Sequence, residues 1–226
     1  MAIKIHRGFM FSVIIPTMWR SKKILKLLKD LQNSNFVNEI ILIDNDTSKK
    51  WVDISDMNKI KYLPQEENIF VNPAWNLGVA TAKNNLLCIC NDDINFDVES
   101  TFKQVLDNSE KLGVFGSRLD IFNFEKRLKG FKEIKTATDF KHAIVIYGFG
   151  MLMFLKKENW IPIPENLKIW FGDNWIIGSH VNSFSTTYDF KIEADEHTTA
   201  GSKDLSKFLR IDSKHWKELK SKHKRF

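Results

Sequence analysis

The sequence predicts a single α/β domain with a Rossmann-like, mostly parallel sheet flanked by helices. The chain has 226 residues, which is enough for one sizeable core. Hydrophobic residues make up 43% of it and aromatic residues 12%, too many for a disordered chain. Over about the first hundred residues, short apolar runs alternate with segments of helical period across short connections, the pattern of a doubly wound sheet.

Four strands are expected in this first part, at residues 11–15, 39–43, 59–63 and 86–90. The first, second and fourth are short, mainly apolar runs, and the first stops at Pro16. After it, Ser21 can cap a helix. The apolar positions of that helix recur at helical spacing and are Ile24, Leu27, Leu28 and Leu31. Asn72 followed by Pro73 predicts a second helix, capped by Asn72, that runs to about Lys83.

The alternation is less regular after the fourth strand. Asp97 can cap a further helix, and residues 112–115 are expected to form another strand. Residues 117–142 are polar and receive no assignment. The run 144–155 contains two glycines and is expected to form a strand and a turn at the edge of a cleft.

Charge is concentrated at one end of the chain. The formal net charge is +6, and much of the excess lies in residues 203–226, which are expected to form a basic C-terminal helix or tail. Two interpretations of this segment remain open. It is either a solvated helix or a surface that attracts phosphate groups, of nucleic acid or of an anionic membrane.

The remaining composition indicates a soluble protein of a reducing compartment. Cys88 and Cys90 are two apart in an apolar run, which predicts buried thiols on one face of a strand rather than a disulfide or a zinc site. No apolar run approaches the roughly 20 residues that cross a bilayer. The first residues lack the pattern of a secretory signal, so the expected compartment is the cytoplasm.

Three polar clusters follow predicted strands. They are residues 16–20, residues 44–48 and residues 91–93. Ligands of open parallel sheets bind beyond the carboxyl ends of the strands, so these clusters should converge on one crevice. The chain contains neither a G-x-G-x-x-G nor a P-loop sequence, which argues against a dinucleotide site of the usual kind. Asp92 and Asp93 can supply oxygen ligands for Mg²⁺ or Mn²⁺, although such a cluster can also form a turn or cap a helix.

These segments resemble the family 2 glycosyltransferases, which have the GT-A fold. Residues 12–17 (SVIIPT) are similar to the family's first strand, and residues 41–48 (ILIDNDTS) to its second strand and acidic turn. Residues 67–93 resemble the segment E-N-x-G-x-x-x-A-R-N-x-G that leads to the D-x-D metal motif, with matches at Glu67, Asn68, Ala74, Asn76, Gly78 and Asp93. Two positions depart from the pattern: Trp75 replaces a basic residue, and Asn91 replaces the first Asp.

The resemblance extends downstream to about residue 200. Residues 147–154 (YGFGMLMF) are similar to an acceptor-side strand, and residues 170–175 (WFGDNW) to the element that carries the catalytic base. The resemblance therefore implies one GT-A domain over residues 1–202. Its nucleotide-binding half would be about 11–97 and its acceptor half about 98–202.

The resemblance also implies site residues. Asp173 would be the catalytic base, and Asp93 and His197 would hold Mn²⁺ or Mg²⁺. Asp92 would hold the ribose or a metal-bound water, and Asn45 or Asp46 would recognise the base. The implied nucleotide-sugar site comprises Pro16, Thr17, Asp44, Asn45, Asp46, Asn76 and Asp92. Simpler roles stay open: Asp173 can cap a helix, and His197 can be a surface loop residue.

The implied activity is metal-dependent, inverting transfer of a sugar from a nucleoside diphosphate sugar, with UDP favoured, to a hydroxyl acceptor. The acceptor is left open between a glycan, a lipid-linked sugar and a modified DNA base. The basic C-terminal segment is compatible with DNA, because it would attract phosphates without reading bases. The alternative is a catalytically silent nucleotide- or nucleic-acid-binding module on the same scaffold.

Overall fold

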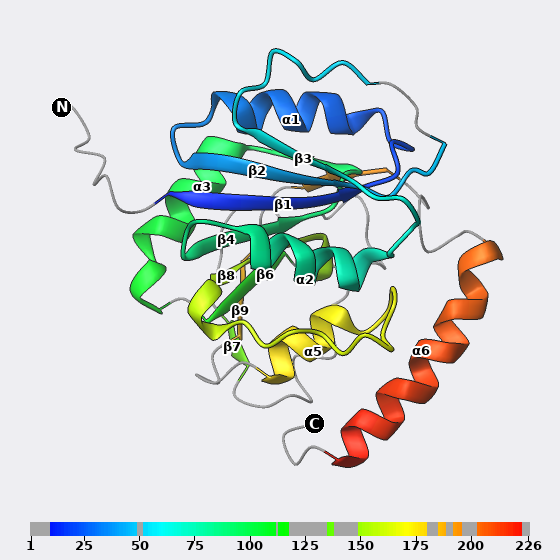
Figure 1. Ribbon diagram of the computed structural model, residues 1–226. Coiled ribbons are helices and arrows are strands. Elements are labelled where there is room, and N and C mark those ends of the chain that lie inside the picture. Colours follow the sequence, from blue (N-terminus) through cyan, green and yellow to red (C-terminus); the bar gives the residue numbers. More distant parts are fainter. Residues whose placement is uncertain are drawn as a thin grey trace.

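The computed structural model describes residues 10–48, 52–111, 113–117, 135–137, 149–179, 185–188, 192–195 and 203–222. Within them, helices cover both faces of a central sheet (Figure 1). The predicted α/β class with a mostly parallel sheet is confirmed. None of the helices in these residues is long and apolar enough to cross a bilayer.

The sheet has the strand order β3-β2-β1-β4-β8-β6-β9-β7. Its strands are β1 (Phe11–Thr17), β2 (Val37–Asp44), β3 (Ile60–Pro64), β4 (Leu86–Cys90), β6 (Val114–Ser117), β7 (Lys135–Ala137), β8 (Leu152–Lys156) and β9 (Ser185–Tyr188). The first four run parallel to one another, as the alternating pattern predicted. β8 is antiparallel to both of its neighbours, β4 and β6, and β7 is antiparallel to β9. A separate antiparallel pair joins β5 (Ile94–Phe96) to β10 (Ile192–Ala194).

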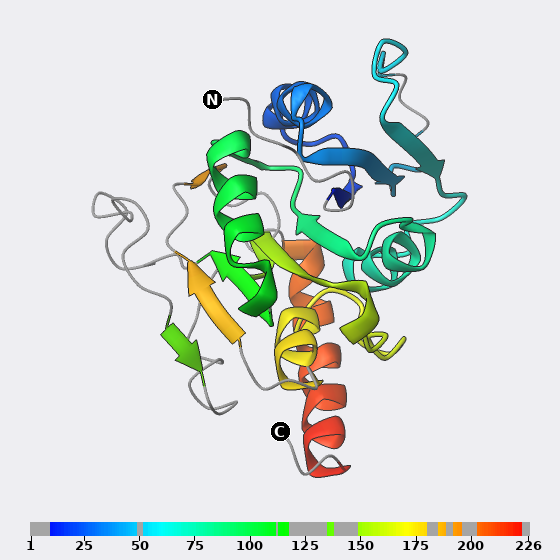
Figure 2. The same ribbon diagram turned by 90° about the vertical axis from the view of Figure 1, so that its left-hand side faces the viewer.

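Helices pack on the sheet in two layers. α1 (Lys23–Asn33) and α3 (Val98–Asp107) bury their apolar faces in one core, whereas α2 (Val71–Thr81), α5 (Gly172–Ser179) and α6 (Lys203–Lys222) contribute to the other. The sheet strands alternate between the cores: Val13 and Ile15 face the first, and Ile14 faces the second. Figure 1 and Figure 2 show α6 on the same side of the sheet as α2 and α5. Short 3₁₀ turns are η1 (Ser109–Lys111), η3 (Phe149–Met151) and η4 (Lys157–Asn159).

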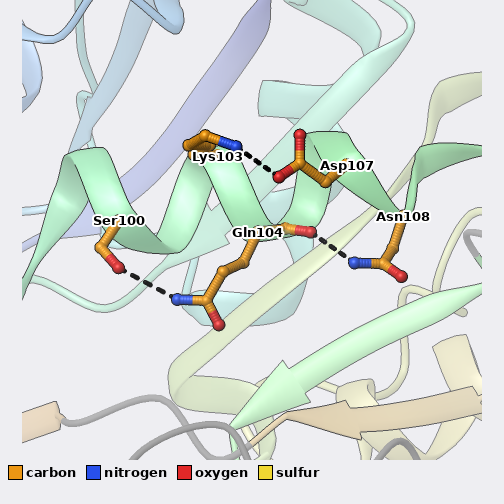
Figure 3. Close-up of polar contacts among 5 residues, drawn as sticks. All are labelled: Ser100, Lys103, Gln104, Asp107 and Asn108. Carbon is orange, nitrogen blue, oxygen red and sulfur yellow. Dashed lines mark hydrogen bonds and ion pairs between the residues drawn. The ribbon is translucent and has the colours of Figure 1, made fainter.

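Local sequence explains α1 and α3. The predicted apolar positions of α1 are its four buried residues. Ser21 is not the N-cap that the sequence predicted, because that position is Lys22, but its hydroxyl accepts the backbone N–H of Lys23. Asp97 caps α3 by accepting the N–H of Ser100 over 3.0 Å, as predicted. The exposed face of α3 carries the ion pair of Lys103 with Asp107 and two further polar contacts one turn apart (Figure 3). Such exposed pairs each add only about 0.3–0.5 kcal/mol, so burial is the main contribution.

One local prediction is corrected by tertiary contacts. Asn72 is not the cap of α2, because the helix already begins at Val71 and follows Phe70, which has a φ of 68°. The buried amide of Asn72 instead donates to the carbonyl oxygens of Leu167 and Trp170. Of the run 144–155, residues 144–148 lie outside the described residues, residues 149–151 form the 3₁₀ turn η3, and the strand β8 starts at Leu152, where pairing with β4 begins. The prediction for Cys88 and Cys90 is confirmed, since both are free, fully buried thiols with pKa values raised by burial.

Gly78 marks the closest approach of α2 to β1. A Cβ at this position would lie 2.3 Å from Cγ2 of Ile14, closer than real carbon atoms pack. We expect Gly78→Ala to lower the free energy of unfolding in urea by about 1–3 kcal/mol through overpacking. The exposed Ala80 on the same helix provides a control, because Ala80→Ser should change stability by less than about 0.5 kcal/mol. If Gly78→Ala were more stable than the wild type, the higher helix propensity of alanine would outweigh the close contact with Ile14.

Candidate functional site

The carboxyl ends of β1, β2 and β4 meet at one edge of the sheet, because these strands are parallel neighbours. Two hydrogen bonds connect the residues at these ends. The backbone N–H of Asn45 donates to the carbonyl oxygen of Thr17 over 2.8 Å. The Thr17 hydroxyl donates to Oδ2 of Asp92 over 2.7 Å. The predicted convergence of the three strand ends is confirmed.

A cavity that is open to solvent lies at this edge of the sheet. Four of the sequence-predicted site residues line it: Pro16, Thr17, Asn45 and Asp92. The other described residues of its wall are Met18, Arg20, Ser21, Asn68, Phe70, Val71, Ile169 and Leu205. The cavity therefore combines the strand ends with the start of α2 and with two segments from the last third of the chain.

Two polar groups of the wall suit a ligand. Oδ1 of Asn45 is buried and accepts no hydrogen bond within the described residues, so an N–H group of a ligand would satisfy it. Arg20 is exposed and is the cationic side chain among the described wall residues. Arg20 belongs to the cluster 16–20 that the strand-end rule selects, although the family resemblance implied no role for it. Ile169 and Leu205 carry no comparable local signal.

Asp92 is held in an electrostatically costly position. Burial raises its pKa to about 6, and the neighbouring carboxylate of Asp93 adds to the rise. Hydrogen bonds from the Thr17 hydroxyl and the Met18 backbone oppose it. A carboxylate with a raised pKa is poorly solvated when it is charged, so a cation beside it would be favourable.

Asp93 is buried next to the cavity and is tied to β10, since its carbonyl oxygen accepts the N–H of Asp195 over 2.9 Å. The Asp195 carboxylate accepts the Ser21 hydroxyl and pairs with Lys23. His197 lies outside the described residues. Among those that are described, no group of three His, Cys, Asp or Glu residues gathers to hold a metal. The carboxylate oxygens of Asp92 and Asp93 are the type of ligand that a hard cation such as Mg²⁺ prefers. Such an ion would require further ligands.

Three other predicted binding residues are not part of the described cavity wall. Asp44 orders the turn after β2, because its carboxylate accepts the Tyr62 hydroxyl and the backbone N–H of Asp46. Asp46 in turn accepts the N–H of Ser48. Both ends of the Asn76 amide are engaged by the backbone of Ile163, at 2.8 and 2.9 Å. Asn76 therefore connects α2 to the segment before α5 rather than to the cavity.

Asp173 lies in the first turn of α5 and also outside the described cavity wall. Its Oδ1 accepts the N–H of Asn174 over 2.8 Å, consistent with the open alternative of a role at the helix start. Its Oδ2 lies against Gly150, where a Cβ would come within 3.3 Å. Burial raises the pKa of Asp173, which suits a general base that must accept a proton near neutral pH.

The sequence is similar to a known family. Residues 12–177 match the model described as "Glycosyl transferase family 2". This range includes β1, β2, β4, Asp92, Asp93 and Asp173. No curated protein sequence matches the chain.

Solved structures of S. aureus TarS share the fold. The fragment 1–349 in complex with UDP superposes with a TM-score of 0.61 at 19% identity, covering 80% of this chain and 58% of that one. The same fragment in complex with UDP-GlcNAc gives a TM-score of 0.61 at 17% identity, over 90% and 65% of the two chains. The chain spans only 39% of the longer S. aureus TarS structure, with a TM-score of 0.60 at 18% identity.

The raised pKa of Asp92 leads to a prediction about stability. The folded state holds the Asp92 proton up to about pH 6, whereas the ordinary value is 3.8, so the stabilisation from this proton is complete below pH 3.8 and is lost as pH rises through about 6. Asp92→Asn removes the charge. We expect the ligand-free variant to exceed the wild type in free energy of unfolding at pH 7.5 by up to about 3 kcal/mol.

Urea denaturation at pH 7.5 and pH 4 measures this difference, which should shrink toward zero at the lower pH. Asp107→Asn is the matched control, because Asp107 forms an exposed pair with Lys103 on α3. It should change stability by less than about 1 kcal/mol at either pH. If Asp92→Asn were less stable than the wild type by the same free energy at both pH values, the charge of Asp92 would not be what costs stability in the folded state.

Proposed function

Because the chain belongs to glycosyl transferase family 2, we propose that it transfers a sugar from a nucleoside diphosphate sugar to a hydroxyl acceptor. One observation carries the proposal: Thr17, Asn45 and Asp92 meet in a single cavity beyond the carboxyl ends of three parallel strands. Ligands of open α/β sheets bind at this edge. The TarS fragments of similar fold were crystallised with UDP and UDP-GlcNAc, which supports a UDP-sugar donor.

The nucleoside end of the donor would lie against β1 and β2. The unpaired Oδ1 of Asn45 can accept a hydrogen bond from the ring N–H of uracil, and Thr17 and Pro16 would complete this side. Asp44 acts indirectly by ordering the turn that carries Asn45 and Asp46. Asp92 would accept a hydroxyl group of the ribose.

The diphosphate requires positive charge. Arg20 supplies one cation at the cavity wall. Asp93 would hold Mn²⁺ or Mg²⁺ together with donor oxygens. His197 would be the second protein ligand, an assignment that rests on the family resemblance. When bound, such an ion acts as a Lewis acid that relieves negative charge on the departing diphosphate.

Asp173 would take the proton of the acceptor hydroxyl while that oxygen attacks C1 of the sugar. Attack on the face opposite the diphosphate inverts the configuration at C1. Burial raises the pKa of Asp173. The raised pKa makes its carboxylate a stronger base at neutral pH than an exposed aspartate would be. Turnover should therefore fall as pH drops through this raised pKa, because the protonated carboxyl cannot accept a proton.

The acceptor is a glycan, a lipid-linked sugar or a modified DNA base. The exposed cations of α6 support an acceptor that carries phosphate, and they are Lys207, Arg210, Lys214 and Lys217. Asn76 contributes to this function as a structural residue that fixes the segment before α5.

The cation is tested by titrating UDP into the protein by calorimetry, with Mn²⁺ or with a chelator. We expect Mn²⁺ to strengthen UDP binding about tenfold or more, and Asp93→Asn to remove this difference. Asp107→Asn should retain it. Equal UDP affinity of the wild type in Mn²⁺ and in chelator would contradict the metal assignment while leaving the cavity as the UDP site.

The catalytic base is tested by Asp173→Asn. Release of UDP from UDP-GlcNAc, with water as acceptor, should fall at least about 100-fold, because a general base contributes about 10²–10⁴-fold. UDP binding should remain, since Asp173 lies outside the described cavity wall. A wild type that binds UDP with Mn²⁺ but turns over no UDP-sugar would support the alternative of a catalytically silent binding module.

A further inference from the structure

The first part of α6 forms a wall of the cavity. Leu205 lines the cavity, as does Ile169. One turn further, the ring of Phe208 contacts the ring of Phe70 at the start of α2, with centroids 4.7 Å apart. The helix thus contacts the site directly, although its sequence is notable mainly for its charge.

The middle of α6 binds the backbone of the segment 167–171. Asp212 is fully buried, and its carboxylate accepts three consecutive backbone N–H groups. The donors are Lys168, at 3.2 Å from both oxygens, and Ile169 and Trp170, each at 2.8 Å. Hydrogen bonds to a charged acceptor are about twice as strong as neutral ones, so this contact fixes the backbone firmly.

The same segment is held from its other side by α2. The side-chain amide of Asn72 donates to the carbonyl oxygens of Leu167 and Trp170. Its backbone N–H donates to the carbonyl oxygen of Lys168. Phe171, with a φ of 65°, stacks on Trp216 of α6 at 5.5 Å and 6°. Asn72 therefore satisfies carbonyl groups of the segment, and Asp212 satisfies its N–H groups.

The position of this segment matters because it joins the two parts of the site. Ile169 lies in the cavity wall, and Asp173 follows the segment in the first turn of α5. Gly172 between them is packed against Asn72, where a Cβ would come within 2.0 Å of Oδ1. A shift of the backbone at residues 168–170 would consequently move both the wall and the proposed base.

We propose that Asp212 is a positioning residue of the transfer reaction, which acts by holding the N–H groups of residues 168–170. Through them it sets Ile169 against the donor and Asp173 against the acceptor oxygen. α6 is then an integral part of the active site rather than an appended basic tail. This inference rests on the proposed function, in which Asp173 is the base.

The test is Asp212→Asn in the full chain, assayed for UDP release from UDP-GlcNAc well below its Tm. The variant keeps the shape of the side chain but loses the charge and part of its capacity to accept hydrogen bonds. We expect kcat to fall about 10- to 100-fold, as for a catalytic group displaced by about 1 Å. The Kd for UDP should change much less, because only Ile169 of the segment reaches the cavity wall. Amide exchange should accelerate at Ile169 and Trp170.

The control is Phe102→Leu, on α3 in the opposite core, which lowers Tm without contacting the segment. It should leave kcat and Kd unchanged. Should Asp212→Asn fail to fold, Asp212→Glu retains the charge and should fold, with kcat between the wild type and the inactive Asp173→Asn.

The outcomes separate the two proposals. A wild type without UDP binding or turnover removes the proposed function, and this inference with it. An active wild type whose Asp212→Asn or Asp212→Glu variant behaves like Phe102→Leu overturns only the positioning role.

Discussion

The hydrogen bond from the Thr17 hydroxyl to Asp92 is the contact on which the site depends. It joins the end of β1 to the residue after β4, while the Asn45 N–H joins β1 to the turn after β2. These contacts exist only because β2, β1 and β4 are adjacent and parallel, so that their carboxyl ends coincide. The cavity is therefore a direct product of strand order, and the rest of the chain completes its walls.

The position of Asp92 carries a cost in stability. Burial and the neighbouring Asp93 disfavour its charged form, and the hydrogen bond from Thr17 offsets only part of this cost. Without a compensating ligand, the folded protein is less stable than it would be with a neutral residue at Asp92. The unpaired Oδ1 of Asn45 is a second such cost in the same cavity. A ligand that brings a cation to Asp92 and an N–H group to Asn45 would offset both costs.

Local patterns in the sequence were sufficient to predict the elements that surround this edge. The periodicity of α1, the cap of α3 and the strand-end rule for Pro16, Thr17, Asn45 and Asp92 depend on neighbouring residues. Contacts between distant segments were not predictable in this way. Asn76 matches a family pattern but bonds to Ile163, and Asp212 looks like an ordinary acid in a basic helix. Their roles depend on how loops and α6 pack.

The antiparallel direction of β8 has a mechanical consequence. It pairs with β4 along its full length, so its first residues lie at the edge where β4 ends, and Met151 accepts the N–H of Asn91 there. Within the described residues, β8 thus joins the part of the sheet formed by β1 to β4 to the part that contains β6. Any movement that separated these two parts of the sheet would have to break the β4–β8 ladder.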